Sequence, residues 1–89
     1  MPEHLYWVTL RTFEREGGER QFRLVFACEL PSVAAIAGEL REAGVVHGQR
    51  LRIADDGQGG RVVREREAFL FGAGIVGSVQ VYSHPVTGL

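Results

Sequence analysis

The sequence predicts a single small α+β domain, residues 1–89, with element order β-β-α-β-β-β and one amphipathic helix packed on one face of an antiparallel sheet. Three observations lead to this prediction. A chain of 89 residues has room for one hydrophobic core. Most segments alternate apolar and polar residues with a period of two, as strands do. One segment alone repeats its apolar residues at the spacing of an α-helix.

The first two predicted strands form a hairpin. Residues 5–13 and 21–28 are rich in β-branched and aromatic side chains, and the second segment alternates strictly. Between them lies EREGGER, whose Gly-Gly pair supplies the positive φ angles that a hairpin loop needs. Phe22, Leu24, Phe26 and Cys28 are expected on the core side of the second strand. The sequence leaves open which side of the first strand is buried.

The predicted helix follows Pro31. Its apolar residues fall at positions i, i+3, i+4 and i+7, namely Val33, Ile36, Ala37 and Leu40. Pro31 suits the first turn, and Gly44 suits the position just past the helix end, where a left-handed residue satisfies the last carbonyls.

Three more strands are predicted after the helix. Residues 49–54 place Leu51 and Ile53 on one side, and residues 61–71 continue as a strand after the turn-forming DDGQGG segment, so these two pair as a second hairpin. Residues 76–83 alternate around Val79 and Val81. These segments complete the predicted element order.

The segment FLFGAGIVGS contains Gly72, Gly74 and Gly77 at the spacing G-x-G-x-x-G, which is typical of a dinucleotide-binding turn. That motif requires a helix to start within it and a parallel strand to follow. Here the next residues form a predicted strand, and the chain ends twelve residues after Gly77. We therefore interpret the three glycines as a bulge or turn between strands and predict no cofactor.

Composition excludes several classes of protein. A hydrophobic content of 45% and a charged content of 24% are typical of a folded globular chain. All ten basic residues are arginine, yet the net charge is only −1, so a nucleic-acid or membrane partner would need locally segregated charge. The single Cys28 and the absence of a signal peptide favour a cytoplasmic location, and no apolar run reaches the roughly 20 residues that span a bilayer.

The sequence favours a non-catalytic protein. His4, His47 and His84 lie far apart without the spacing of metal ligands, so no metal site is predicted. Asp55 and Asp56 are adjacent in a glycine-rich turn, and we assign them to turn formation. No residue is predicted to be catalytic, although a site assembled from scattered His, Ser and Asp residues is kept as one alternative.

The candidate binding residues are arginines and aromatics in the predicted strands, at positions expected to point away from the core. They are Trp7, Arg11, Phe13, Arg23, Arg50, Arg52, Arg64 and Arg66. Most acidic residues lie in the loops or on the outer helix face, so the open face of the sheet should carry arginine. Glu65 and Glu67 are the exception and could offset arginine across strands.

We predict a small protein-binding module that acts through this arginine and aromatic face or through a sheet edge, with self-association as one form of binding. A subunit, an adaptor or a small inhibitor would fit, and the size and simplicity of the chain suggest a phage or another mobile element as its origin. The alternative is a single-stranded nucleic-acid-binding protein that uses the same face, since bases stack on Trp and phosphates pair with Arg.

Overall fold

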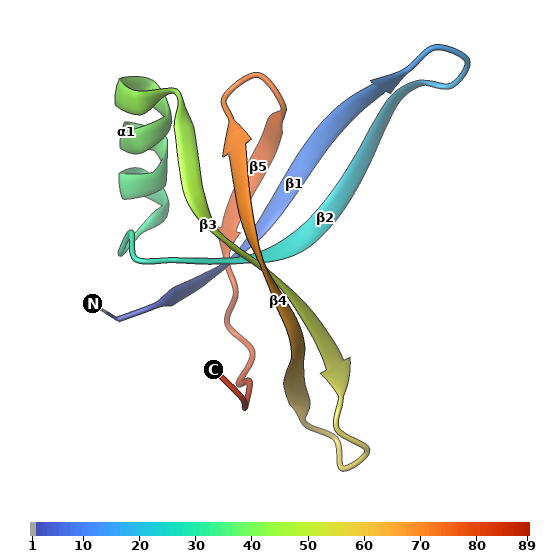
Figure 1. Cartoon of the computed structure of the whole chain (residues 1–89), viewed down its shortest axis with the longest axis vertical. Helices are drawn as coiled ribbons and strands as arrows, with labels where there is room; N and C mark the ends of the chain where they lie inside the picture. Colours follow the sequence, from blue (N-terminus) through green and yellow to red (C-terminus); the bar gives the residue numbers. More distant parts are fainter. Residues whose placement is uncertain (1) are drawn as a thin grey trace.

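One helix and two long hairpins make up most of the fold, which a computed structural model describes for residues 2–89, with the backbone alone at Glu14 (Figure 1). The elements are β1 (His4–Glu14), β2 (Gly18–Cys28), α1 (Val33–Ala43), β3 (Val45–Asp55), β4 (Arg61–Gly72) and β5 (Val76–Val81). The strands form one antiparallel sheet in the order β4-β3-β2-β1-β5. The predicted α+β class and the order β-β-α-β-β-β are confirmed.

Both hairpins turn as the local sequence predicts. All 11 residues of β1 pair with β2, and Gly18 has a φ of 71° at the loop. In the second hairpin Gly57 and Gly59 have positive φ angles of 85° and 82°. The carboxylate of Asp55 accepts a hydrogen bond from the Gly57 N–H at 2.8 Å, and that of Asp56 accepts from the N–H groups of the turn that follows. The two aspartates therefore stabilise the turn, in agreement with the sequence.

Helix α1 has a cap at each end. The Ser32 hydroxyl accepts a hydrogen bond from the Ala35 N–H at 3.0 Å, so Pro31 precedes the cap instead of occupying the first turn. At the other end Gly44 has a φ of 80° and donates to the Leu40 carbonyl at 3.0 Å. Gly44 is thus the left-handed cap that the sequence predicts.

The larger apolar cluster joins α1 to one side of the sheet. Its buried members are Tyr6, Val8, Leu10, Leu24, Phe26, Cys28, Ile36, Val46 and Phe71. The Phe26 and Phe71 rings meet edge to face at 5.0 Å between centroids. Tyr6, Val8 and Leu10 identify the buried side of β1, which the sequence left open.

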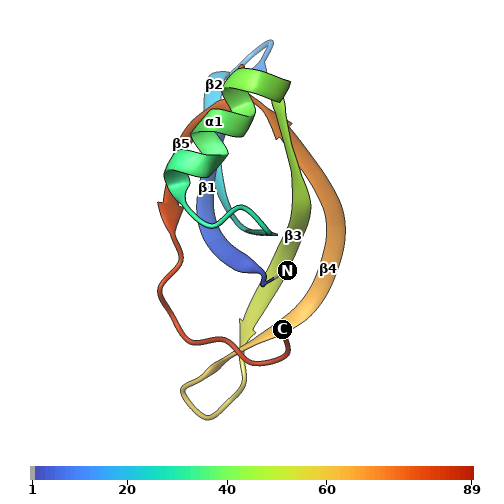
Figure 2. The ribbon, with the colours of Figure 1, turned by 90° about the vertical axis from the view of Figure 1, so that its left-hand side faces the viewer.

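A second, smaller cluster lies on the side of the sheet away from Ile36. It contains Val25, Ala27, Leu51 and Tyr82, with Leu5, Trp7, Ile53, Val63 and Val86 packed against it. The chain after β5 crosses to the start of β4, where Val62 and Thr87 form a parallel bridge (Figure 2). The expectation of a fully open face opposite the helix is therefore wrong, because the C-terminal segment covers part of it.

The three glycines of the G-x-G-x-x-G segment connect two strands. Gly72 ends β4, Gly74 lies in the turn, and Gly77 sits in β5 beside the register shift at Thr9 and Leu10 of β1. None of the three has a positive φ. Since β5 starts at Val76 and no helix begins within the motif, its geometry is that of a turn and a bulge.

Candidate functional site

The eight candidate residues do not share one face. Arg11 pairs with Gln21 and Trp7 with Val25, so both lie on the side of the smaller cluster, whereas Arg50 pairs with Phe26 of the larger cluster. By the same alternation Phe13, Arg23 and Arg66 lie with Trp7, and Arg52 lies with Arg50. Arg64 is the extra residue at the register shift between β3 and β4. The sequence reasoning failed for Arg50 and Arg52 because Leu51 faces the smaller cluster.

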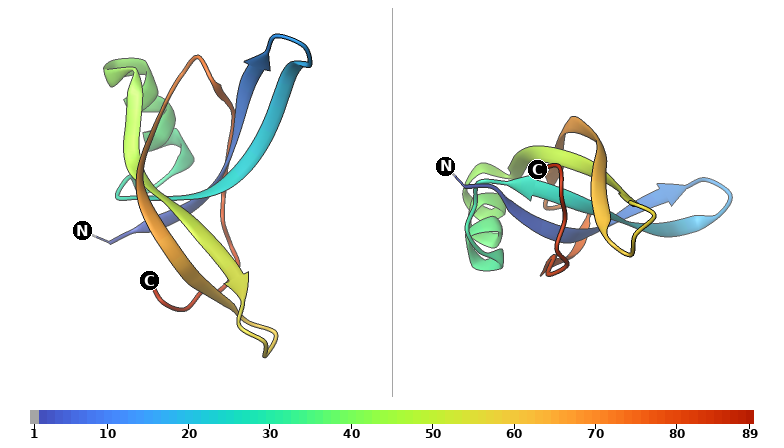
Figure 3. Two further views of the ribbon diagram at one scale, coloured as in Figure 1. Left: turned by 45° about the vertical axis from the view of Figure 1, so that its right-hand side comes forward. Right: turned by 90° about the horizontal axis from the view of Figure 1, so that it is seen from below.

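Four of the arginines in the chain nevertheless meet where the two hairpins separate. Strands β2 and β3 pair at only three positions, Val25 with Leu51, Phe26 with Arg50 and Ala27 with Gln49. Beyond Val25 the hairpins diverge, which Figures 1 and 3 show as a fork. We call the space at this point the fork cleft. It has a volume of 260 Å³ and is lined by Trp7, Arg23, Leu24, Val25, Arg50, Leu51, Arg52, Ile53, Arg61 and Tyr82.

Aromatic rings hold one wall of the fork cleft. The Arg23 guanidinium lies over the Trp7 ring, 4.4 Å from its centroid, and donates a hydrogen bond of 3.2 Å to the Gln80 side chain. Trp7 packs against Tyr82 at 5.1 Å between centroids. The Tyr82 hydroxyl in turn accepts a hydrogen bond from Arg61 at 3.2 Å. Two guanidinium groups are thus fixed beside two rings.

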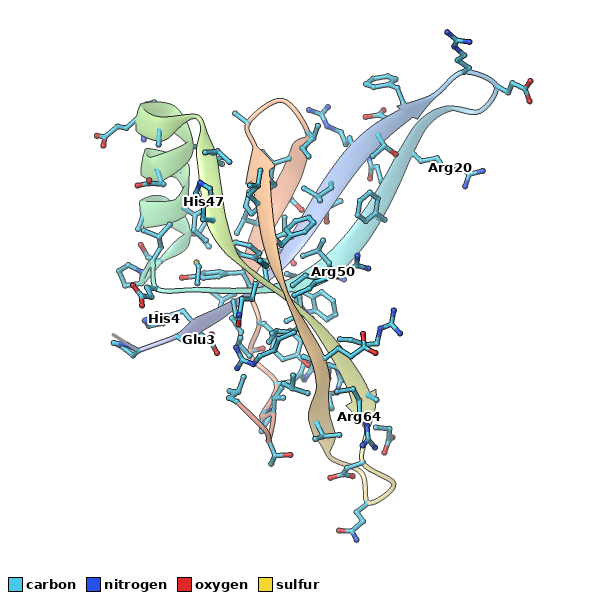
Figure 4. The ribbon with its side chains drawn as sticks, in the orientation of Figure 1. Glu3, His4, Arg20, His47, Arg50 and Arg64 are labelled. Carbon is cyan, nitrogen blue, oxygen red and sulfur yellow. The ribbon has the colours of Figure 1, made fainter. Side chains whose placement is uncertain are left out.

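The opposite wall carries arginines in cross-strand ion pairs. Arg50 lies 3.6 Å from Glu67 and Arg52 lies 3.9 Å from Glu65, as the sequence anticipated for these two acids. All four side chains are well exposed, and exposed pairs at such distances contribute little to stability. The residues lining the fork cleft include four arginines and no acidic group, and Glu65 and Glu67 pair with two of these arginines from outside the lining. Figure 4 shows Arg50 near the centre of the fork.

The remaining candidates lie outside the fork cleft. Arg11 makes an exposed ion pair of 3.7 Å with Glu19, and the Phe13 side chain is 82% exposed on the β1–β2 hairpin. Arg66 donates two hydrogen bonds to the Glu3 carboxylate, at 2.8 and 3.0 Å, and one of 2.6 Å to Gln49. Arg64 lies toward the end of the β3–β4 hairpin (Figure 4). Arg66 therefore ties the N-terminal segment to the sheet.

The Glu3–Arg66 pair gives stability that depends on pH. The hydrogen bond from Arg66 lowers the pKa of Glu3 below its ordinary value of about 4.3. Because the folded-state pKa is the lower one, the stabilisation is fully present above about pH 4.3 and is lost as the pH falls through the folded-state value. We expect Glu3→Gln to lower the free energy of unfolding by roughly 0.5–1 kcal/mol at pH 7 and to have no effect near pH 2.

Urea unfolding at both pH values measures this difference. Glu65→Gln is the matched control, since its ion pair with Arg52 is long and both side chains are about 70% exposed, at 68% and 71%. A Glu3→Gln variant with the same loss at both pH values would contradict an electrostatic role for the pair.

Sequence reasoning missed Arg61 and Tyr82, although both line the fork cleft. Arg61 was assigned only to a strand start, and Tyr82 to the end of the last strand. Tyr82 is 6% exposed, and its N–H donates to the Leu5 carbonyl at 3.0 Å. The one available signal was that an aromatic residue precedes Pro85 in a segment that resumes apolar character at Val86.

Cys28 is buried, and the His84 ring packs against an aromatic side chain. Burial raises the pKa of the Cys28 thiol, which disfavours the nucleophilic thiolate. His84 packs edge-on against Tyr82 at 5.4 Å. Within residues 2–89 no three His, Cys, Asp or Glu side chains are grouped so as to hold a metal ion. No helix in the same residues has the length and apolar character needed to cross a membrane.

The fold and the fork cleft define a small α+β domain with a cationic, aromatic-lined cleft between two hairpins. Comparison with known proteins adds no family to this description: no protein-family model, no curated protein and no solved structure matches the chain.

Proposed function

We propose that this protein is a non-catalytic binding module that takes an extended, acidic protein segment into the fork cleft. One observation carries the proposal. Strand β2 pairs with β1 along its whole length but with β3 at only three positions, so residues 18–24 have a free edge that faces the fork. A free edge beside four arginines suits a segment that adds a strand and brings carboxylates.

The backbone supplies the affinity in this mode of binding. Every second residue of a strand directs its N–H and C=O groups toward the neighbouring position in the sheet. For residues 18–24 that position is not filled by β3. An incoming strand would pair with these groups, and its side chains would alternate between the two sides of the sheet.

The arginines supply the preference for acidic residues. Arg23 and Arg61 border the fork cleft on the side of Trp7, and Arg52 borders it from β3. Guanidinium groups bind carboxylates in a bidentate manner, and the long pairs of Arg50 and Arg52 with their glutamates exchange at little cost. Side chains that could serve catalysis, such as Asp55, Asp56 and Cys28, have structural roles instead.

A peptide titration tests the proposal. The probe is a blocked octapeptide of alternating Glu and Val, followed by Trp7 emission, with the Lys-Val peptide as its counterpart. We expect the acidic peptide to bind and the basic one not to bind. Arg52→Glu should weaken binding roughly tenfold, because it replaces an attractive charge with a repulsive one in the cleft.

Arg64→Glu is the matched control, since it makes the same charge change at a residue that does not line the fork cleft. Equal losses for Arg52→Glu and Arg64→Glu would point to a general charge effect. Equal binding of the acidic and basic peptides would contradict the proposed role of the cleft arginines in selecting acidic residues.

One observation favours a second candidate, a single-stranded nucleic-acid-binding protein. Arg23 over Trp7, beside Tyr82, resembles the arginine and aromatic platforms on which bases stack. Titration with oligothymidylate at low and high salt decides this candidate. Trp7 quenching that weakens as salt rises would support nucleic-acid binding. Unchanged emission would reject this candidate and leave the acidic protein segment as the proposed ligand.

A further inference from the structure

We propose that the segment added at the fork is β2 of a second copy of this chain, so that the protein forms a symmetric dimer through antiparallel β2–β2 pairing. This inference rests on one part of the proposed function, strand addition at residues 18–24, and names a partner for it. Residues 18–24 are not acidic, so the charge complementarity comes from Glu19 and Arg23 of the two copies and not from the preference of the cleft for carboxylates. The hairpin β1–β2 projects from the body of the molecule, and residues 11–23 are exposed wherever their side chains are described (Figure 1). A two-stranded hairpin is marginal in water, and pairing two of them makes a four-stranded sheet β1-β2-β2-β1.

Geometry restricts the register of such a pair. With a two-fold axis perpendicular to the sheet, a given residue points to the same face of the joint sheet in both copies. Directly opposite residues also point to the same face, so an odd-numbered residue can lie opposite only an odd-numbered one, and an even-numbered residue opposite only an even-numbered one. The axis must therefore pass through a single residue. Within the free edge the central choices are Arg20, Gln21 and Phe22, each of which would face its own copy.

Charge selects Gln21 as the centre. In this register Glu19 of one copy lies opposite Arg23 of the other, twice by symmetry, and each Arg20 lies opposite a Phe22 ring. Centring on Arg20 would place like charges opposite each other, and centring on Phe22 would leave Glu19 without a cationic partner. Opposite charges across a strand pair stabilise a sheet, and like charges destabilise it.

Glu19, Phe22 and Arg23 are exposed in the monomer. Glu19 forms a long ion pair of 3.7 Å with Arg11, so it can bridge Arg11 and the incoming Arg23. Arg23 can keep its place over the Trp7 ring and exchange its exposed hydrogen bond to Gln80 for the incoming Glu19. Phe22 is 41% exposed, and in the dimer it would be diagonal to Phe22 of the second copy, within reach of an aromatic contact.

The edge of β4 fits self-pairing less well. Its start is already bridged by Thr87, and it contains the register shift at Arg64. Bulges and charged side chains are common protection for an edge strand. The edge of β5 carries no charged residue between Val76 and Val81, so nothing in its side chains selects a register there.

Disulfide trapping tests the register. In a Cys28→Ala background, Gln21→Cys should form a disulfide-linked dimer on mild oxidation, because directly opposite residues have Cα atoms about 4.5–5.5 Å apart. Thr12→Cys, on the far strand of the same hairpin, is the matched control and should remain unlinked. Gln80→Cys reports pairing at β5, and circular dichroism establishes that each variant folds.

A charge swap tests the same contact without crosslinking. We expect light scattering to give about twice the 9.8 kDa chain mass for the unmodified protein. Arg23→Glu should weaken the dimer roughly tenfold, because two attractive pairs become two repulsive ones. Adding Glu19→Arg restores opposite charges in the Gln21-centred register, and the double variant should regain most of the affinity.

The outcomes separate this inference from the proposed function. A monomer at all concentrations that still binds the Glu-Val peptide would overturn self-pairing and leave strand addition in place. A monomer that fails to bind the peptide would overturn both. A dimer linked through Gln80→Cys or Thr12→Cys, and not through Gln21→Cys, would overturn the β2–β2 contact.

Discussion

Gly48→Val is expected to lower the free energy of unfolding by about 3 kcal/mol, a large part of the 5–15 kcal/mol that is typical of small domains. Gly48 lies in β3, directly before Gln49, which pairs with Ala27 of β2. A Cβ atom at this position would overlap the Ala27 carbonyl oxygen and lie 2.5 Å from the Phe26 ring. Neither neighbour can yield, because the first is backbone and the second is fully buried between Phe69 and Phe71.

Gly38→Ala is the matched control for this prediction. Gly38 lies within α1 with no atom in the way of a Cβ, and its φ is not positive. Replacing an unconstrained helical glycine with alanine should stabilise the fold by roughly 0.5–1 kcal/mol. Urea unfolding followed by circular dichroism measures both variants, and a neutral Gly48→Val would contradict the close approach of β2 and β3.

The elements were predictable because each is marked locally. The helix end at Gly44 and the loops at Gly18, Gly57 and Gly59 all need positive φ, and glycine is the residue that provides it. The strands show a period of two over most of their length. Local marks of this kind do not depend on which strand lies beside which.

The faces of the sheet were not predictable from the same alternation. Val46 belongs to the larger cluster and Leu51 to the smaller one, so β3 changes its buried side along its length. Val46 and Leu51 are an odd number of residues apart, which places them on opposite sides of a regular strand. This spacing was the sequence signal for the change of side. Because Leu51 and Ile53 were taken as the core side, Arg50 and Arg52 were assigned to the same face as Arg11, and the pairing of Arg50 with Phe26 shows otherwise.

The fork cleft has no sequence signature either. It exists because β2 and β3 pair at three positions and then diverge, and pairing length between strands joined through a helix is a tertiary property. The predicted binding residues include four that line the fork cleft, namely Trp7, Arg23, Arg50 and Arg52. The prediction placed them together on a flat face of the sheet. Residue type could be read from the sequence, and its spatial grouping could not.

Tyr82→Ala is the second change for which we expect a large effect, a loss of about 3 kcal/mol in the free energy of unfolding. Tyr82 anchors the C-terminal segment on the side of the sheet away from α1, through its ring contact with Trp7 and its N–H bond to Leu5. Removing the ring leaves a cavity in the smaller cluster, in which Val25, Ala27 and Leu51 are also buried. Trp7 would then lose the ring that packs against it, and its emission should shift to the red.

Tyr82→Phe separates packing from hydrogen bonding. It keeps the ring against Trp7 and loses only the hydroxyl that accepts from Arg61, so we expect a loss of about 0.5–1 kcal/mol and unchanged Trp7 emission. Limited proteolysis should cut the segment after β5 faster in Tyr82→Ala than in Tyr82→Phe, because the segment would lose the anchoring ring and keep the backbone hydrogen bonds at residue 82 and Thr87. Equal proteolysis and equal stability of the two variants would mean that the ring does not hold the segment. The positions of Arg23 and Trp7 at the fork cleft would then depend on contacts other than the Tyr82 ring.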